Sequence, residues 1–235
     1  MNQTNLNEEV IVIDKICKEY GYMDNIVKAV DEVSVTIKRG EFTALVGPSG
    51  SGKTTLLNLM SGLDTPSRGK VLLAGKNISE MHGNDLSDFR RDHIGFIFQS
   101  YNLIPVLTAY ENIEYILLLQ GIDPNERRDR VMTILKEVGL EGREHRRPTE
   151  LSGGQQQRVA VARAMVSRPD IILADEPTAN LDSHTGAALL DMMKELNEKK
   201  KITFVFSTHD HMIMERAKRL VILKDGKLFK DEIKA

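Results

Sequence analysis

Residues 47–54 read Gly47-Pro48-Ser49-Gly50-Ser51-Gly52-Lys53-Thr54, and the fold prediction starts from this stretch. An apolar segment, Phe42 to Val46, precedes it, and a segment with helical character, Thr54 to Met60, follows it. Glycines allow successive backbone N–H groups to converge on phosphate oxygens, and the N-terminus of the following helix adds its positive end. Strand, loop and helix together predict a phosphate-binding loop.

The composition of this loop also predicts its ligands. Lys53 can bridge the outer phosphates of a nucleoside triphosphate, and the Thr54 hydroxyl can bind Mg²⁺. We therefore expect ATP and Mg²⁺ as ligands, with Lys53 also taking part in catalysis. The residues expected to contact the nucleotide here are Gly47, Pro48, Ser49, Gly50, Ser51, Gly52, Lys53, Thr54 and Thr55.

A second apolar segment, Ile171 to Ala174, ends in the adjacent carboxylates Asp175 and Glu176. Sheets of α/β proteins bind ligands at the carboxyl ends of their strands, and adjacent strand residues face opposite ways. We expect Asp175 to hold Mg²⁺ and Glu176 to polarise an attacking water. An acidic pair alone could simply cap the turn at Pro177. Kinases, GTPases, helicases and transport ATPases all remain open at this point.

The order of segments predicts an α/β fold. Apolar runs on either side of a helix indicate parallel strands covered on both faces, and apolar residues in the middle of the chain fall at helical spacing. We predict a P-loop NTPase (RecA-like) core with an N-terminal antiparallel β subdomain and an inserted α-helical subdomain. The three parts of this single domain, 1–235, are the β subdomain with the start of the core (1–83), the mostly helical subdomain (84–167) and the remainder of the core (168–235).

Individual elements can be predicted from β-branched and apolar runs and from turn residues. The expected strands are 10–13, 33–37, 42–46, 71–73, 94–98, 171–174, 202–207, 220–223 and 227–229. The expected helices are 54–60, 156–166, 187–196 and 211–217. The pair Asp225-Gly226 predicts a hairpin turn between the last two strands.

Composition and charge tell against several classes of protein. Thirty-two Lys and Arg against 34 Asp and Glu give a formal charge of −2, so no nucleic-acid partner is expected. The cluster Arg143, His145, Arg146, Arg147 is interpreted as a solvated loop. The single cysteine, Cys17, and the polar segment 1–9 predict a cytoplasmic protein without a secretory signal. No apolar run approaches the roughly 20 residues of a membrane span, so another chain would supply any membrane part.

A second glycine motif, Leu151-Ser152-Gly153-Gly154-Gln155, precedes the amphipathic segment 156–166. The Ser-Gly-Gly triplet alone is typical of an ordinary helix N-cap. With the phosphate loop upstream and the acidic strand end downstream, the full pentapeptide resembles the signature loop of the ABC transporter ATP-binding subunits. The resemblance covers nearly the whole chain, and it selects this family from the P-loop alternatives.

The resemblance assigns further residues. It implies that Ser152, Gly153, Gly154 and Gln155 contact the γ-phosphate held by a partner subunit, and that Asn180 to Asp182 form the D-loop. Gln99, in the Q-loop, would act in catalysis and bind Mg²⁺, and His209 would be the switch histidine. Tyr20 resembles the aromatic residue that stacks on adenine, although Tyr22 competes for this role. Two copies would then close as a homodimer around two Mg·ATP.

Four stretches resemble the branch that holds the lipoprotein-releasing, macrolide-exporter and cell-division ATPases: 62–64, 90–99, 101–105 and 107–112. This implies a separate transmembrane permease, with the chain peripheral on the inner face of the cell membrane, in export, lipoprotein release or mechanotransmission. A cell-division-type regulator without transport is the alternative. The apolar residues Tyr101, Leu103, Ile104 and Pro105 either border the groove for a cytoplasmic helix of the permease or belong to the helical core.

Three rival classes share some of these motifs. Chromosome and repair ATPases interrupt the core with coiled coils or zinc modules, and this sequence has neither heptad runs nor Cys pairs. Translation-type ABC proteins carry two cassettes, whereas this sequence carries one set of motifs. A non-catalytic scaffold disagrees with Glu176. We therefore expect an ATP hydrolase.

Overall fold

The computed structural model describes residues 8–21 and 25–234, and Tyr22 lies outside them. The strands are β1 Glu9–Tyr20, β2 Val27–Lys38, β3 Phe42–Val46, β4 Arg68–Leu73, β5 Lys76–Asn77, β6 Ile94–Ile97, β7 Ile171–Asp175, β8 Thr203–Thr208, β9 Arg219–Lys224 and β10 Lys227–Ile233. The α-helices are α1 Lys53–Met60, α2 Gly83–His93, α3 Ala109–Leu119, α4 Pro124–Glu137, α5 Gly153–Val166, α6 Ser183–Lys200 and α7 His211–Arg216. Short 3-10 helices occupy Ile78–Glu80 and Pro148–Glu150.

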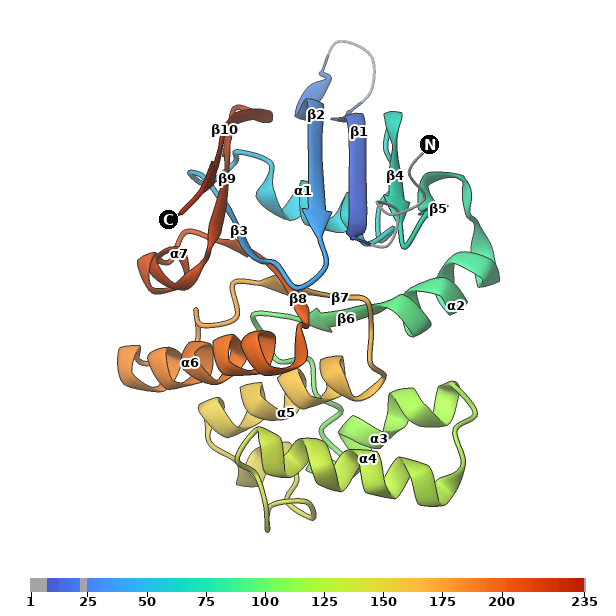
Figure 1. Cartoon of the computed structure of the whole chain (residues 1–235), viewed down its shortest axis with the longest axis vertical. Coiled ribbons are helices and arrows are strands. Elements are labelled where there is room, and N and C mark those ends of the chain that lie inside the picture. The colour runs from blue at the N-terminus through green and yellow to red at the C-terminus, as the bar shows by residue number, and fades with distance from the viewer. Residues whose placement is uncertain (1–7, 22–24, 235) are drawn as a thin grey trace.

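Two sheets organise the chain (Figure 1). The six-stranded sheet has the order β10-β9-β3-β8-β7-β6, and all its strands are parallel except β10, which pairs antiparallel with β9. The four-stranded sheet, β2-β1-β4-β5, is antiparallel. The predicted α/β core with an N-terminal antiparallel sheet and a helical segment is therefore confirmed.

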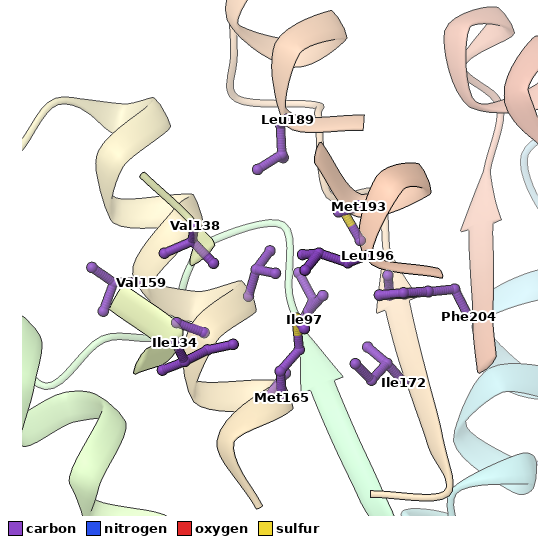
Figure 2. Packing of buried hydrophobic residues seen from close by; sticks show 14 of the residues in the cluster. Ile97, Ile134, Val138, Val159, Met165, Ile172, Leu189, Met193, Leu196 and Phe204 are labelled. Atoms are coloured by element: carbon purple, nitrogen blue, oxygen red, sulfur yellow. The ribbon is translucent and has the colours of Figure 1, made fainter. Parts of the chain in front are cut away.

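Alternate residues of the parallel strands point into two separate cores, as expected for a sheet covered on both faces. Phe42, Ala44 and Val46 of β3 face one core, while Leu45 faces the other. The first core is closed by α3, α4, α5 and α6, and Figure 2 shows Met165 of α5 and Leu196 of α6 packed near Ile172 of β7. The second core is closed by α1 and the four-stranded sheet. Helices α1 and α5 therefore cover opposite faces of the six-stranded sheet.

The helical part is built from α3 and α4 packed on α5. Thr108 begins α3 with a capping box to Glu111, and Asp123 followed by proline begins α4. Strand β6 lies within the range 84–167 but belongs to the six-stranded sheet as its edge strand. In the described part of the chain, no helix is both long and apolar enough to cross a bilayer.

The register of the parallel strands brings their carboxyl ends to one edge. Val46 of β3 pairs with Thr208 of β8, and Ser207 of β8 pairs with Asp175 of β7. Ile97 of β6 lies beside Ala174 of β7. The loops that follow these four strands therefore start side by side, which is the position where open α/β sheets bind ligands.

Candidate active site

The loop after β3 has a backbone that needs glycine at two positions. Gly47 has φ 157°, and a Cβ atom there would lie 2.3 Å from the carbonyl oxygen of Leu223. Gly52 has φ 97° at the N-cap of α1, and a Cβ atom there would lie 2.4 Å from the carbonyl oxygen of Ala29. No other residue type would fit these contacts without moving the backbone. The loop therefore approaches β2 and β9 closely and begins α1 directly.

The polar groups of this loop can be tested for their fit to a phosphate. The Lys53 ammonium donates to the carbonyl oxygens of Gly47 (2.8 Å) and Pro48 (3.0 Å), so it lies over the loop. Ser51 is buried, and its hydroxyl has no hydrogen-bond partner among the described residues. A buried hydroxyl without a partner costs free energy that a phosphate oxygen would recover. The loop thus fits a polyphosphate.

Asp175 ends β7 opposite the start of α1. One of its carboxylate oxygens lies 3.5 Å from the Thr54 hydroxyl. Burial raises the pKa of Asp175 above its ordinary value, and the negative charge of Glu176 raises it further. A hydroxyl and a carboxylate held this close supply the oxygen ligands that Mg²⁺ prefers, so the pair fits the ion.

Glu176 is fixed by the neighbouring strand β8. It has φ 45°, and its backbone N–H donates to the carbonyl oxygen of Ser207 at 2.9 Å. Its carboxylate accepts hydrogen bonds from the Thr208 hydroxyl (2.9 Å) and the His209 backbone N–H (3.2 Å), and His209 Nδ1 lies 2.6 Å from it. The carboxylate is mostly buried, whereas 76% of the His209 side chain is exposed. Glu176 is therefore oriented by contacts with Thr208, at the end of β8, and with the next residue, His209.

Gln99 follows β6 and is exposed. Its carbonyl oxygen accepts a hydrogen bond from Asn180 Nδ2 at 2.9 Å. The next loop residues, Tyr101 and Asn102, have positive φ angles, and their carbonyl oxygens accept hydrogen bonds from the guanidinium of Arg163 on α5. The loop after β6 is therefore attached both to the loop after β7 and to α5.

The signature motif forms the start of α5. Ser152 Oγ accepts a hydrogen bond from the Gln155 N–H at 3.3 Å, and the Gln155 side chain accepts one from the Ser152 N–H at 3.0 Å. These bonds form a capping box. A Cβ atom on Gly154 would lie 2.3 Å from Cγ2 of Thr185 on α6, so this glycine permits the two helices to meet. Gly154 thus has a packing role besides any contact with ATP.

Asp182 is the N-cap of α6. Its carboxylate accepts hydrogen bonds from the backbone N–H groups of His184 (3.1 Å) and Thr185 (3.0 Å). Hydrogen bonds from Thr185 and from these N–H groups lower the pKa of Asp182. In this structure the polar groups of Asp182 and of Ser152 are therefore both used by their own helices.

Tyr20 lies at the end of β1, with 43% of its surface exposed. Its hydroxyl donates to a carboxylate oxygen of Asp64 at 2.6 Å. Burial raises the pKa of Tyr20, and the hydrogen bond to Asp64 raises it further. The structure therefore gives the predicted base-stacking residue a partly exposed ring and an anchored hydroxyl.

The predicted site residues thus form two groups. The phosphate loop, Asp175, Glu176 and His209 meet at the carboxyl edge of the sheet. Ser152 to Gln155 and Asp182 begin helices that cover the face opposite α1, and no hydrogen bond or ion pair between described residues joins them to the phosphate loop.

Three residues that hold the site were not predicted from the sequence: Thr208, Arg163 and Asp64. The position of Thr208, between a buried strand and His209, was a usable signal. Arg163 bonds to residues 61 and 62 positions away along the chain. Asp64 bonds to Tyr20 and Lys18, which are 44 and 46 positions away. The sequence alone contains no sign of contacts at such separations.

A phosphate-binding loop between a parallel strand and a helix, with two carboxylates at the end of another parallel strand of the same sheet, defines the class of P-loop nucleotide hydrolases. Residues 30–179 match the family model described as ABC transporter. The chain belongs to the ABC transporter family, and it is an ATP-binding cassette ATPase.

Relatives and solved structures agree with this assignment. The chain is 45% identical over 222 residues to a macrolide export ATP-binding/permease protein of Hyphomonas neptunium, covering 94% of this chain but only 34% of that protein. It is 47% identical over 205 residues to the ABC transporter ATP-binding protein YtrE of Bacillus subtilis, covering 87% of this chain and 89% of YtrE. A dimeric, post-hydrolysis structure of the cassette MJ0796 with ADP and phosphate superposes with a TM-score of 0.86 and 42% identity, covering 95% of this chain and 98% of that one.

Proposed function

We propose that two copies of this chain close around two Mg·ATP and thereby drive a separate membrane permease. The observation that carries the dimer is the separation of the two nucleotide-binding motifs. The phosphate loop begins α1 on one face of the sheet, and the signature motif begins α5 on the other. One copy therefore offers each nucleotide only one of its two contact surfaces. The similar cassette MJ0796 is described as dimeric with ADP and phosphate bound.

The contacts of each side chain support a role in ATP hydrolysis. Lys53 would transfer its ammonium from the Gly47 and Pro48 carbonyls to the outer phosphates, and Ser51 would gain the hydrogen bond that it lacks. Thr54, Asp175 and Gln99 would hold Mg²⁺, which neutralises charge on the phosphates. Glu176 would accept a proton from the attacking water, and His209 would keep Glu176 and the phosphate end of the site aligned.

The signature residues would complete the site of the opposite copy. Ser152, Gly153 and the first backbone N–H groups of α5 form a helix N-terminus, which favours negative charge. Asp182 lies at the start of the adjacent helix and would approach the same nucleotide. The exposed Ser152 and Asp182 side chains are free to exchange some of their capping bonds for contacts with the partner.

A complementation experiment tests the shared site. A Lys53→Ala chain keeps its signature motif but loses its phosphate loop, whereas a Ser152→Arg chain keeps its phosphate loop but blocks its signature motif. We expect each variant alone to be nearly inactive. A mixed dimer contains one complete site, so mixing the two should restore hydrolysis to a measurable fraction of the wild-type rate.

The controls make this result specific. Mixing Lys53→Ala with Glu176→Gln should restore nothing, because both changes damage the same half of the site. Asn125→Arg, an exposed position on α4, should leave hydrolysis unchanged. If Ser152→Arg alone hydrolyses ATP at the wild-type rate, the shared-site proposal is wrong.

The described surface also offers a place for the permease. A groove of about 580 Å³ lies between the loop after β6 and the helices α2 and α3, and its lining residues include Leu63, Phe96, Phe98, Tyr115, Ile116 and Leu119. Leu63, Tyr115 and Leu119 are each about half exposed. Charged side chains of α2, Asp88 and Arg91, also line it. A groove lined by both apolar and charged side chains fits an amphipathic helix.

The sequence placed this groove beside Tyr101, Leu103, Ile104 and Pro105. Of the described residues 101–105, Asn102 alone lines it. Leu103 packs against the main core, and Tyr101, Leu103 and Pro105 line a smaller hollow of about 360 Å³. The docking proposal therefore moves from this apolar run to α2 and α3.

Two neighbouring leucines allow a matched test of docking. Leu118 and Leu119 are both 50% exposed, but only Leu119 lines the groove. With the chain expressed in its own cell, we expect Leu119→Glu to release it from the isolated membrane fraction, while Leu118→Glu stays bound. ATP hydrolysis by the isolated chain should be unchanged in both. Equal membrane binding by the two variants would contradict docking in this groove.

We further propose that the chain works at the inner face of the cell membrane, held there by its permease. The macrolide export proteins carry a permease in the same polypeptide, as their name states, and this chain spans about a third of their length. Export or mechanical work on a substrate outside the membrane fits this relationship. Membrane release by Leu119→Glu would also support the location.

A further inference from the structure

Asp64 connects the segment after α1 to the end of β1. One carboxylate oxygen accepts the hydrogen bond from the Tyr20 hydroxyl at 2.6 Å. The other accepts bonds from the Lys18 ammonium at 2.5 Å and from the Thr65 backbone N–H at 2.7 Å. Burial raises the pKa of Asp64, but the hydrogen bonds from Lys18 and Tyr20 outweigh it, so the net pKa lies below the ordinary value. The carboxylate is therefore charged at neutral pH.

The backbone of Asp64 is fixed to the helix that follows the phosphate loop. The N–H groups of Leu63 (3.0 Å) and Asp64 (3.2 Å) both donate to the carbonyl oxygen of Asn58 in the last part of α1. Arg90 of α2 also donates to the carbonyl oxygen of Gly62 at 2.7 Å. Since α1 begins at Lys53, Asp64 is attached to the same rigid unit that would hold the phosphates.

The Tyr20 ring is thereby held in one orientation. The Lys18 ammonium lies 5.0 Å from the ring centroid, a distance typical of a cation–π contact, and Lys18 is itself held by Asp64. The ring remains 43% exposed, so part of its surface is open to a ligand. A ring fixed before binding loses little freedom when a base stacks on it.

We propose that Asp64 is a positioning residue for the nucleotide base, because it fixes the Tyr20 ring at a set distance from the phosphate loop. This inference rests on the proposed function and on the predicted stacking of Tyr20 on the adenine of ATP. Asp64 itself touches no nucleotide. It acts through Tyr20 and Lys18. Through Asp64, the Tyr20 ring and the phosphate loop are both attached to α1.

The test separates base binding from phosphate binding. Dissociation constants are measured for ATP and for inorganic tripolyphosphate, a probe with phosphates but no base, both with Mg²⁺. We expect Asp64→Ala to weaken ATP binding roughly tenfold, the size of one lost base–aromatic stack, and to leave tripolyphosphate binding unchanged. Hydrolysis at saturating ATP should keep its wild-type kcat, so that only KM rises.

Two further variants keep the test valid if Asp64→Ala folds poorly. Tyr20→Phe removes only the anchored hydroxyl, and it should weaken ATP binding less than Asp64→Ala but in the same direction. Asp64→Asn keeps an acceptor for Tyr20 and should recover part of the lost affinity. The matched control is Asp14→Ala on the same strand as Tyr20, whose side chain is 53% exposed and pairs only with Lys70 at 3.7 Å; it should bind ATP like the wild type.

The possible failures are distinguishable. If Tyr20→Ala binds ATP as tightly as the wild type, the predicted stacking of Tyr20 on adenine is wrong. If Tyr20→Ala weakens ATP binding but Asp64→Ala and Tyr20→Phe do not, the stack exists and Asp64 does not position it. Equal losses of ATP and tripolyphosphate binding would show that Asp64 supports the fold of the loop and would overturn the proposal.

Discussion

The two halves of the proposed nucleotide site differ in how their polar groups are satisfied. At the carboxyl edge of the sheet, Glu176 is held by Thr208 and His209, so residues of different strands bond to one another. At the starts of α5 and α6, Ser152 and Asp182 bond to their own helices. The first half is preorganised within one chain, whereas the second is a pair of capped helix ends available for a partner.

This difference predicts different results for substitutions in the two halves. Changes at the carboxyl edge should act on the chemical step, because the geometry of Glu176 is already formed there. Changes at the capped helix ends should act on stability and on dimer closure. Four variants test this comparison.

The largest effect is expected for Glu176→Gln. An amide cannot accept a proton from water, so hydrolysis should fall by roughly 10²- to 10⁴-fold while ATP binding persists. Sedimentation with Mg·ATP should then show an accumulated dimer. Glu195→Gln, on an exposed part of α6, is the control. Hydrolysis by Glu176→Gln at the wild-type rate would refute the assignment of the base.

A smaller loss of rate is expected for Thr208→Val. This change removes one of the hydrogen bonds that orient Glu176, and a bond to a charged group contributes about 1.5 to 3 kcal/mol, so kcat should fall at least roughly tenfold. Thr203, at the other end of the same strand, is equally buried and donates no bond to Glu176. Thr203→Val should therefore lower the melting temperature without a comparable loss of kcat. Similar kcat values for both variants would contradict preorganisation by Thr208.

For the signature helix, Gly154→Ala should affect packing first. The new methyl group would meet Cγ2 of Thr185, and overpacking of this kind costs about 1 to 3 kcal/mol of unfolding free energy. Chemical denaturation measures the loss. Thr185→Ser removes Cγ2, so the double variant should recover most of the stability. If Gly154→Ala is as stable as the wild type but hydrolyses ATP more slowly, the packing role is wrong and this glycine acts through contact with ATP.

The smallest effect is expected at Asp182. The Asp182→Ala variant loses the N-cap of α6, and its free energy of unfolding should fall by about 1 kcal/mol. The Asp182→Asn variant keeps a good N-cap, so its stability should be close to that of the wild type. Thermal unfolding compares the two. If Asp182 also approaches the partner's nucleotide, Asn should still slow hydrolysis. Wild-type hydrolysis by Asp182→Asn would limit this residue to capping.

Local sequence predicted the parts of the site that depend on short segments. Phe42–Val46 was predicted with its observed bounds, and the loop from Gly47 to Thr54 was predicted with its helix. The hairpin at Asp225-Gly226 is also confirmed, because β9 and β10 pair antiparallel across it. In each case the chemistry of a few adjacent residues determines the backbone.

Other features depended on the three-dimensional arrangement. Strands β1 and β2 each run for 12 residues, because register shifts and positive φ angles at Lys15 and Glu32 let the pairing continue past segments that lack simple alternation. Which face of the six-stranded sheet α1 and α5 each cover could not be predicted from their sequences. The bond between Tyr20 and Asp64 joins residues 44 positions apart and required the fold to be known.

Arg163 gives the comparison a mechanical consequence. Its guanidinium holds the backbone of Tyr101 and Asn102, and Asn102 lines the groove proposed for the permease. From Arg163 back to Ser152, helix α5 is a stiff rod about 16 Å long. A displacement of the loop at the proposed groove would therefore be passed along α5 to the signature motif at its other end.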